Sequence, residues 1–310
     1  MDPPAGLELV NDPALAQQSG YELPPTLPEG STDRYVLECQ GEIYGSKSAA
    51  AKWFQHLGGT LKQNGFDDQI IADSTVYLKK SRCGTKFVLL AVVVDDLIEF
   101  HNKKANDMFD GYLSNMRDHY DITHEEGLNF YCGIGFETLP DGSVKASMSV
   151  YIDRCLERFH ITDINTIKTP AAYGFNVRPC DVDENPTREN LVLYQSMCGS
   201  LIYAATVLRG DIAWIVGLLM RFMTKPSKFL INAAMRVFRY LKHTKDRGPR
   251  FVRKGQLPEG QEGNILYAFT DTSHGDCLFT YRTTGSYSLM INGVVFMYRV
   301  GRLPLQTIST

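Results

Sequence analysis

An apolar run that ends in two adjacent aspartates constrains this chain more than any other feature of its sequence. Residues 87–94 read Phe-Val-Leu-Leu-Ala-Val-Val-Val, and this β-branched stretch of strand length predicts a buried strand. Asp95 and Asp96 follow at once, and a second apolar stretch begins at Leu97. The pattern therefore predicts a tight hairpin with both carboxylates at its apex.

The adjacent carboxylates allow two interpretations. Asp-Asp can be a polar turn between two strands, because aspartate suits turns. Alternatively, two carboxylates beside a buried strand are costly to desolvate unless a cation compensates them. Hard divalent cations such as Mg²⁺ take such oxygen ligands together with substrate phosphates. Spacing alone favours the turn, so the choice between them depends on the rest of the chain.

Ordered motifs across the chain favour the second interpretation. Val93–Asp96 resembles the Tyr-Val-Asp-Asp box of reverse transcriptases, and its surroundings resemble a copia-type LTR retrotransposon Pol polyprotein. Further segments resemble those of this family in the same order: Tyr44–Lys47, Lys52–Phe54, Phe130–Ile134, Tyr151–Phe159, Thr169-Pro170, Tyr194–Tyr203, Asp211–Ala213 and Val237–Thr244. Although no single motif is decisive, the ordered set spans roughly residues 35 to 310 and is specific.

The resemblance implies an α+β fold with three structural parts. A reverse transcriptase palm would carry the Asp-Asp hairpin, a helical thumb or connection region would follow, and a partial RNase H-like sheet would end the chain. The implied domains are an acidic Pro-rich tail over 1–34, a palm and fingers remnant over 35–185, the helical region over 186–255 and a truncated RNase H-like domain over 262–310.

Local patterns predict individual elements within these parts. Asp211 is expected to cap a helix with an apolar face from Ile212 to Met223. Asn292-Gly293 predicts a type I′ hairpin turn. Helices are predicted over 48–64, 106–120 and 228–243, and strands over 74–80, 86–94, 130–138, 144–148, 265–270, 287–291 and 294–298.

The implied polymerase site depends on divalent metal. In polymerases, two metal ions stabilise the attacking and leaving oxygens of an in-line phosphoryl displacement. The resemblance implies that Asp95, assisted by Asp96, binds Mg²⁺ or Mn²⁺ during RNA-directed DNA synthesis from dNTPs on an RNA or DNA template-primer. It also implies a third carboxylate on an earlier strand, but Asp2 and Asp12 stand among prolines and polar residues. Val93 in place of tyrosine is a further departure.

A second implied contact is to the template and the incoming nucleotide. Gly45 and Lys47 resemble the family segment that lies under the templating base and the dNTP, where glycine lets a base or sugar approach the backbone. Spacing alone favours a turn glycine ahead of a helix. Ser46 stands where the family has leucine, which weakens the correspondence.

The C-terminal part suggests a second catalytic carboxylate. Asp271 is expected to end a strand, and it resembles the first catalytic aspartate of the copia RNase H domain. Thr284–Tyr287 and Gln306–Thr310 resemble later segments of that domain. The catalytic glutamate and the next aspartate of the domain would follow Thr310. Without the resemblance, Asp271 would be read equally well as a turn residue at a strand end.

Charge is unevenly distributed, although the net charge is only -3. Residues 1–45 hold eight acidic residues and one basic residue, whereas 221–254 hold eleven basic residues and one acidic residue. This asymmetry suggests a polyanion-facing region. Arg236, Arg239 and Lys242 recur every three residues on a predicted helix, so we expect them to bind an RNA–DNA hybrid. A solvated helix face is the alternative.

Cysteine usage and hydropathy argue against a zinc-binding protein, a disulfide-rich secreted protein and a membrane protein. The seven cysteines are odd in number, and they form neither a zinc-type pair nor a disulfide framework. Reduced thiols are expected, and the N-terminus lacks a signal-peptide pattern. The most apolar stretch, 201–223, contains Arg209, Asp211 and Arg221, which favours buried helices over a membrane span. We therefore expect an intracellular protein, cytoplasmic or nuclear, without a membrane partner.

The sequence is best explained as an internal fragment of a copia-type Pol polyprotein, truncated at both ends. Its family function would be RNA-directed DNA polymerase, and the isolated chain is expected to be inactive. One alternative is a non-catalytic nucleic-acid-binding relic that kept the basic region. Another is an inert pseudogene product, against which the intact apolar periodicity of 211–243 argues.

Overall fold

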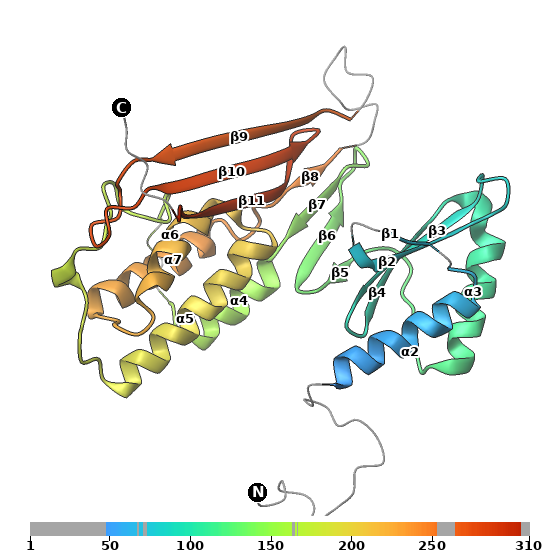
Figure 1. The fold of residues 1–310 in the computed structure, drawn as a ribbon, viewed down its shortest axis with the longest axis horizontal. Coiled ribbons are helices and arrows are strands. Elements are labelled where there is room, and N and C mark those ends of the chain that lie inside the picture. Colours follow the sequence, from blue (N-terminus) through green and yellow to red (C-terminus); the bar gives the residue numbers. More distant parts are fainter. Residues whose placement is uncertain are drawn as a thin grey trace, which may run out of the picture. The chain divides into compact units, whose positions relative to one another are not determined.

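The computed structural model describes residues 48–66, 68–70, 73–162, 165, 167–252 and 264–304 (Figure 1). The chain divides into two units, Met1–Gly65 and Phe66–Thr310. In the first unit, the predicted helix is α2, Ala49–Gln63. It ends at Asn64 because Gly65 adopts φ 80°, a left-handed conformation that glycine reaches without steric cost.

The second unit begins with an antiparallel four-stranded sheet of order β1-β2-β3-β4. Its strands are β1 Asp68–Ile70, β2 Asp73–Lys80, β3 Phe87–Val93 and β4 Asp96–His101. Along β3, Val88, Leu90 and Val92 are buried while Phe87 and Val93 are exposed. The strand that we expected to be buried throughout therefore buries one face only, as an antiparallel sheet allows.

One helix follows this sheet and packs on its last strand. After a 3₁₀ turn, η2 Lys103–Ala105, helix α3 runs over Asn106–His119, as the sequence predicts. It buries Phe109, Tyr112, Leu113 and Met116 at helical spacing. The ring of Phe109 stacks on His101 of β4, with ring centroids 4.3 Å apart. This contact joins α3 to the strand that begins with Asp96.

A second antiparallel sheet has the order β5-β6-β7-β8. Its strands are β5 Phe130–Tyr131, β6 Ile134–Thr138, β7 Val144–Ser147 and β8 Arg250–Phe251. The prediction of one strand over 130–138 is wrong, because Cys132 and Gly133 adopt φ 48° and 79° and turn the chain back on itself. Strands β6 and β7 are joined by a turn in which Gly142 adopts φ 78°.

The helical region forms the largest apolar core. Its elements are α4 Ser149–Arg158, η3 Pro179–Asp181, α5 Arg188–Val207, η4 Gly210–Ile212, α6 Ala213–Leu219, η5 Met220–Phe222 and α7 Lys228–His243. Ala234, Val237, Phe238 and Leu241 of α7 are buried. None of the helices among the described residues is long and apolar enough to cross a membrane.

Asp211 does not cap a helix, which corrects the expectation from sequence. It lies inside η4, and α6 begins after Ile212 without a side-chain cap. Its carboxylate instead accepts two hydrogen bonds from Arg209, whose side chain is 1% exposed. A buried guanidinium needs a counter-ion, and this requirement takes the carboxylate away from the helix end.

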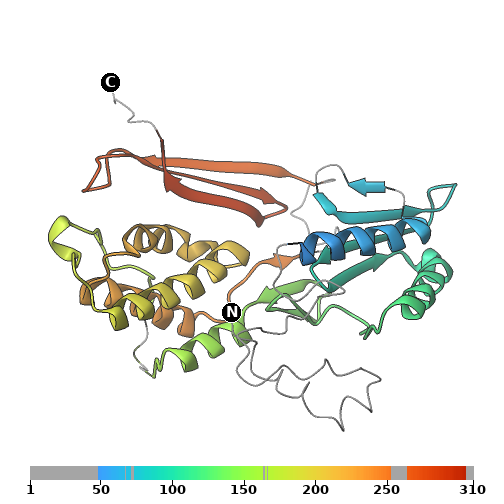
Figure 2. The same cartoon turned by 60° about the horizontal axis from the view of Figure 1, so that its bottom comes forward.

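The last sheet has the order β11-β10-β9. Its strands are β9 Leu266–Ser273, β10 Thr284–Ile291 and β11 Val294–Arg302, and each is longer than predicted. Asn292 and Gly293 adopt φ 51° and 81°, as a type I′ turn requires. The sheet contacts the helical region where the Tyr298 hydroxyl of β11 donates to the Ala205 carbonyl of α5. Its three strands run side by side in Figure 2, coloured orange to red.

Candidate functional site

The acidic pair lies at the tip of the β3–β4 hairpin. Val93 pairs with Asp96, and Val94 and Asp95 form the two-residue turn between them. Val94 adopts φ 58°, which is strained for a β-branched residue. Both aspartates are exposed. The desolvation cost that we expected for carboxylates next to a buried strand therefore does not arise, because the strand ends before the apex.

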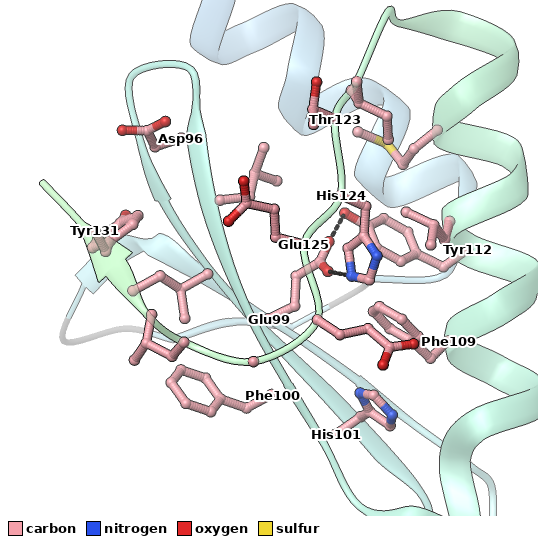
Figure 3. A pocket seen from close by; sticks show the side chains of 18 of the residues that line it. Asp96, Glu99, Phe100, His101, Phe109, Tyr112, Thr123, His124, Glu125 and Tyr131 are labelled. Atoms are coloured by element: carbon pink, nitrogen blue, oxygen red, sulfur yellow. Dashed lines mark hydrogen bonds and ion pairs between the residues drawn. The ribbon is translucent and has the colours of Figure 1, made fainter. Parts of the chain in front are cut away.

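An open cavity of about 850 Å³ lies beside this hairpin and is lined by β4, α3, residues 121–128 and β5. Figure 3 shows Asp96 on the hairpin and Tyr131 on the neighbouring strand. The cavity wall is strongly acidic. Its carboxylates belong to Asp95, Asp96, Glu99, Asp110, Asp121, Glu125 and Glu126.

A buried network forms one wall of this cavity. Tyr112 donates a hydrogen bond to Glu99 Oε1 at 3.1 Å, and His124 Nε2 lies 3.4 Å from Glu99 Oε2 (Figure 3). Burial raises the pKa of Glu99, while the Tyr112 hydrogen bond and the charges of His124 and His101 oppose that rise. The network ties β4, α3 and the loop of residues 121–128 together below the hairpin.

The turn at Cys132 brings another element to the acidic pair. Tyr131 lines the cavity with Asp95 and Asp96, and its hydroxyl is buried with no hydrogen-bond partner among the described residues. Burial raises the pKa of Tyr131, and the charges of Cys132 and Asp96 add to the rise. Tyr203 of α5 donates a 2.6 Å hydrogen bond to the Cys132 carbonyl and so holds this turn.

The sequence reasoning did not select Glu99, Tyr112, His124 or Tyr131 as site residues. Their positions in the sequence give no sign that they share a cavity, because they come from a strand, a helix, a loop and a second sheet. The motif Phe130–Ile134 was the one available signal for Tyr131. Across the ranges that the structure describes, no group of three or more His, Cys, Asp or Glu side chains could hold a metal ion.

The prediction that Asp271 ends a strand is wrong. Strand β9 continues to Ser273, because Thr272 and Ser273 pair with Gly285 and Thr284 of β10. Asp271 itself pairs with Ser286 and is exposed, and its Oδ1 accepts a 2.8 Å hydrogen bond from the Thr272 amide.

Two of the predicted nucleic-acid-binding cations, Arg236 and Lys242, contact the segment after α4. Arg236 Nη2 lies 3.2 Å from the Thr169 hydroxyl, and Lys242 Nζ lies 3.3 Å from the Thr162 carbonyl. Both of these contacts are to neutral groups. Gly45 and Lys47, the predicted nucleotide contacts, lie outside the described residues.

Comparison with known proteins supports the resemblance. Residues 21–173 match the family described as reverse transcriptase (RNA-dependent DNA polymerase). A putative transposon Ty5-1 protein of Saccharomyces cerevisiae is 27% identical over 270 residues, which cover 87% of this chain and 83% of that protein. A retrovirus-related Pol polyprotein from transposon TNT 1-94 of Nicotiana tabacum is 27% identical over 293 residues, 92% of this chain and 20% of the polyprotein.

A third relative is named as an effector protein and not as a transposon protein. The secreted RxLR effector protein 161 of Plasmopara viticola is 31% identical over 108 residues, 35% of this chain and 71% of that protein. No solved structure matches the chain. The family match, the two transposon relatives and the ordered motifs together show that this chain belongs to the reverse transcriptase family of copia-type retrotransposon Pol polyproteins.

Proposed function

We propose that Asp95 and Asp96 are metal ligands of an RNA-directed DNA polymerase palm formed by β1–β4 and α3. The observation that carries this proposal is their position: both carboxylates are exposed at the tip of a hairpin rooted in a sheet with a buried face. Rigid strands hold the two groups at fixed spacing, while the tip leaves them open to a nucleotide. The family match over residues 21–173 supports the assignment.

The donor set fits a hard divalent cation. Mg²⁺ is usually held by one or two carboxylates together with substrate phosphates and water. Among the described residues, neither Asp95 nor Asp96 forms an ion pair with a basic side chain, so their oxygens are open to such a cation. When bound, the metal would stabilise negative charge on the oxygens of phosphoryl transfer.

Nucleotide and template-primer are proposed to approach the hairpin tip rather than enter the neighbouring cavity. The cavity wall carries Glu99, Asp110, Asp121, Glu125 and Glu126 besides the acidic pair. This lining would repel the phosphates of a dNTP or a nucleic-acid strand. The cavity walls, held by the Glu99–Tyr112–His124 network, instead support the hairpin from one side.

The isolated chain is proposed to bind divalent metal without extending a primer. Two-metal chemistry in this family uses three carboxylates, and within the part of the chain that the structure describes the hairpin tip supplies two of them. With two ligands, the affinity for Mg²⁺ should be low and the in-line geometry incomplete. A primer-extension assay with Mg²⁺ or Mn²⁺ on RNA and DNA templates tests this directly, and extension that disappears in Asp95→Asn would contradict it.

Metal binding itself is tested by titrating Mn²⁺ into the chain and following its electron paramagnetic resonance signal. Asp95→Asn and Asp96→Asn should each weaken the strongest Mn²⁺ site at least tenfold. Asp110→Asn is the matched control, because Asp110 is an exposed acid that lines the same cavity but lies on α3. Equal weakening in the control would show that general acidity, not the hairpin tip, attracts the metal.

A further inference from the structure

Two arginines from different elements converge at Thr284, far along the sequence from the acidic hairpin. Arg221 belongs to η5, and its Nη2 lies 3.4 Å from the Thr284 hydroxyl. Arg302 ends β11 and is the cross-strand partner of Thr284. Burial lowers the pKa of Arg221, and the charge of Arg302 lowers it further. The two guanidinium groups are therefore close enough to repel each other.

One donor of this pair, Nη1 of Arg221, is buried and has no hydrogen-bond partner among the residues that the structure describes. A buried charged donor without an acceptor is costly, so such an atom calls for a missing partner. Arg302 Nη1 reaches only a neutral group, the Thr280 hydroxyl, at 3.4 Å. Within the described part of the chain, neither arginine has a carboxylate within ion-pair distance.

Asp276, an acid whose charge acts on Arg221, is already hydrogen-bonded to Thr284. Asp276 accepts hydrogen bonds from the Thr284 amide at 2.8 Å and from the Thr284 hydroxyl at 2.7 Å. Its charge raises the pKa of Arg221 only as a minor influence beside burial and Arg302. The carboxylate of Asp276, which is shared with Thr284, and the Cys277 thiol therefore oppose the charges of two guanidinium groups.

A buried thiol beside Arg221 shows that these surroundings favour a negative charge. Cys277 is 4% exposed. Burial acts to raise the pKa of this thiol, but hydrogen bonds from Thr280 and the backbone amides of Phe279 and Thr280, with the Arg221 charge, bring it to about 7. The surroundings of Cys277 therefore already stabilise one negative charge in a buried position.

We propose that the Arg221–Arg302 cluster, formed by Arg221, Thr280, Thr284 and Arg302, binds a phosphate group. A tetrahedral oxyanion accepts several hydrogen bonds at once, and guanidinium groups match it with paired donors. The Arg221 Nη1 would gain its missing acceptor, and the repulsion between the arginines would be relieved. The phosphate can belong to the backbone of an RNA–DNA hybrid or to a free phosphate-bearing ligand. The cluster does not depend on the metal ligands proposed at the hairpin.

The site itself is tested with inorganic phosphate on the full chain. Thermal unfolding is measured in sodium phosphate and in sodium chloride at equal ionic strength and pH. The wild-type midpoint should rise specifically in phosphate, because a ligand that binds the folded state stabilises it. Arg221→Gln and Arg302→Gln should abolish the rise. Arg299→Gln is the matched control, since Arg299 is an exposed arginine on the same strand, opposite Tyr287.

The source of the phosphate is tested with an RNA–DNA hybrid. Fluorescence anisotropy at several salt concentrations gives the slope of log K against log salt, and each lost phosphate contact should flatten it by roughly 0.9. A flatter slope in Arg302→Gln supports a nucleic-acid backbone contact. An unchanged slope together with a lost phosphate effect supports the site and assigns it to a free phosphate-bearing ligand.

Two results would overturn the proposal: no phosphate-specific rise in the wild type, or an equal rise in Arg302→Gln. Arg302 is exposed, so its substitution keeps the test valid even if Arg221→Gln fails to fold. Asp95→Asn should retain the full phosphate effect. Failure of the phosphate site can therefore be told apart from failure of the proposed polymerase site.

Discussion

The ion pair between the buried Arg209 and the partly exposed Asp211 allows a sharp test of what stabilises the helical region. Arg209 Nε and Nη2 bind Asp211 at 2.9 and 2.7 Å, and its Nη1 donates to the Thr244 carbonyl at 2.9 Å. The Tyr240 hydroxyl donates to Asp211 at 2.7 Å. The guanidinium thus joins η4 to the end of α7. Replacing Asp211 by asparagine keeps the volume and removes the counter-ion.

The expected loss follows from burial. Breaking a buried ion pair on one side costs roughly 3–5 kcal/mol. The Asp211 side chain is 35% exposed, so solvent screens part of that cost, and we expect Asp211→Asn to lower the free energy of unfolding by about 2–3 kcal/mol. Asp153→Asn is the control, because the Asp153–Lys245 pair is exposed and should contribute less than about 1 kcal/mol.

The lowered pKa of Asp211 also predicts how the loss of stability in Asp211→Asn depends on pH. Burial acts to raise the pKa of Asp211, but the hydrogen bond and charge of Arg209 and the Tyr240 hydroxyl hold it below the ordinary value. Because the folded pKa lies below the unfolded pKa, the carboxylate stabilises fully above about pH 4 and ceases to do so as pH falls through the folded pKa. The difference between wild type and Asp211→Asn should therefore shrink in acid.

Urea unfolding followed by Trp214 fluorescence measures this difference. Trp214 lies on α6, and a Trp53→Phe background removes the other tryptophan. A difference below about 0.5 kcal/mol at pH 7, or one that stays constant down to pH 3, would refute the account. Replacing both partners by apolar residues should cost less than removing Asp211 alone.

Three further predictions concern other described residues. Gly133→Ala should destabilise the chain by about 1–3 kcal/mol in thermal unfolding, since φ is 79° and the new Cβ would lie 3.3 Å from a tyrosine hydroxyl. Changing Arg236, Arg239 and Lys242 together to glutamate should flatten the slope of log K against log salt for RNA–DNA hybrid binding by about two to three units. Unchanged binding would mean that the three residues form only a solvated surface. Cys83, whose pKa neighbouring hydroxyls lower to about 7, should be alkylated by iodoacetamide with a midpoint near pH 7. A midpoint near pH 9 would contradict this.

Elements that depend on local pattern could be read directly from the sequence. Helix α7 has the predicted bounds, because Ser227 caps its start and apolar residues recur at helical spacing up to Leu241. The β3–β4 hairpin and the Asn292-Gly293 turn likewise follow from neighbouring residues. The ordered motifs identified the family for the same reason, because each motif is a short run of neighbouring residues that can be recognised without knowing the fold.

Contacts between distant segments were decided only by the tertiary structure. Arg209 is buried because Asp211, Tyr240 and Thr244 surround its charge, and an isolated helix pattern cannot show this. Thr272 extends β9 past Asp271 because β10 offers partners for it. Pairing across a sheet and burial of charge depend on which segments meet in space. The sequence therefore determined the family and the local elements, whereas the Glu99 network and the Arg221–Arg302 cluster required the fold.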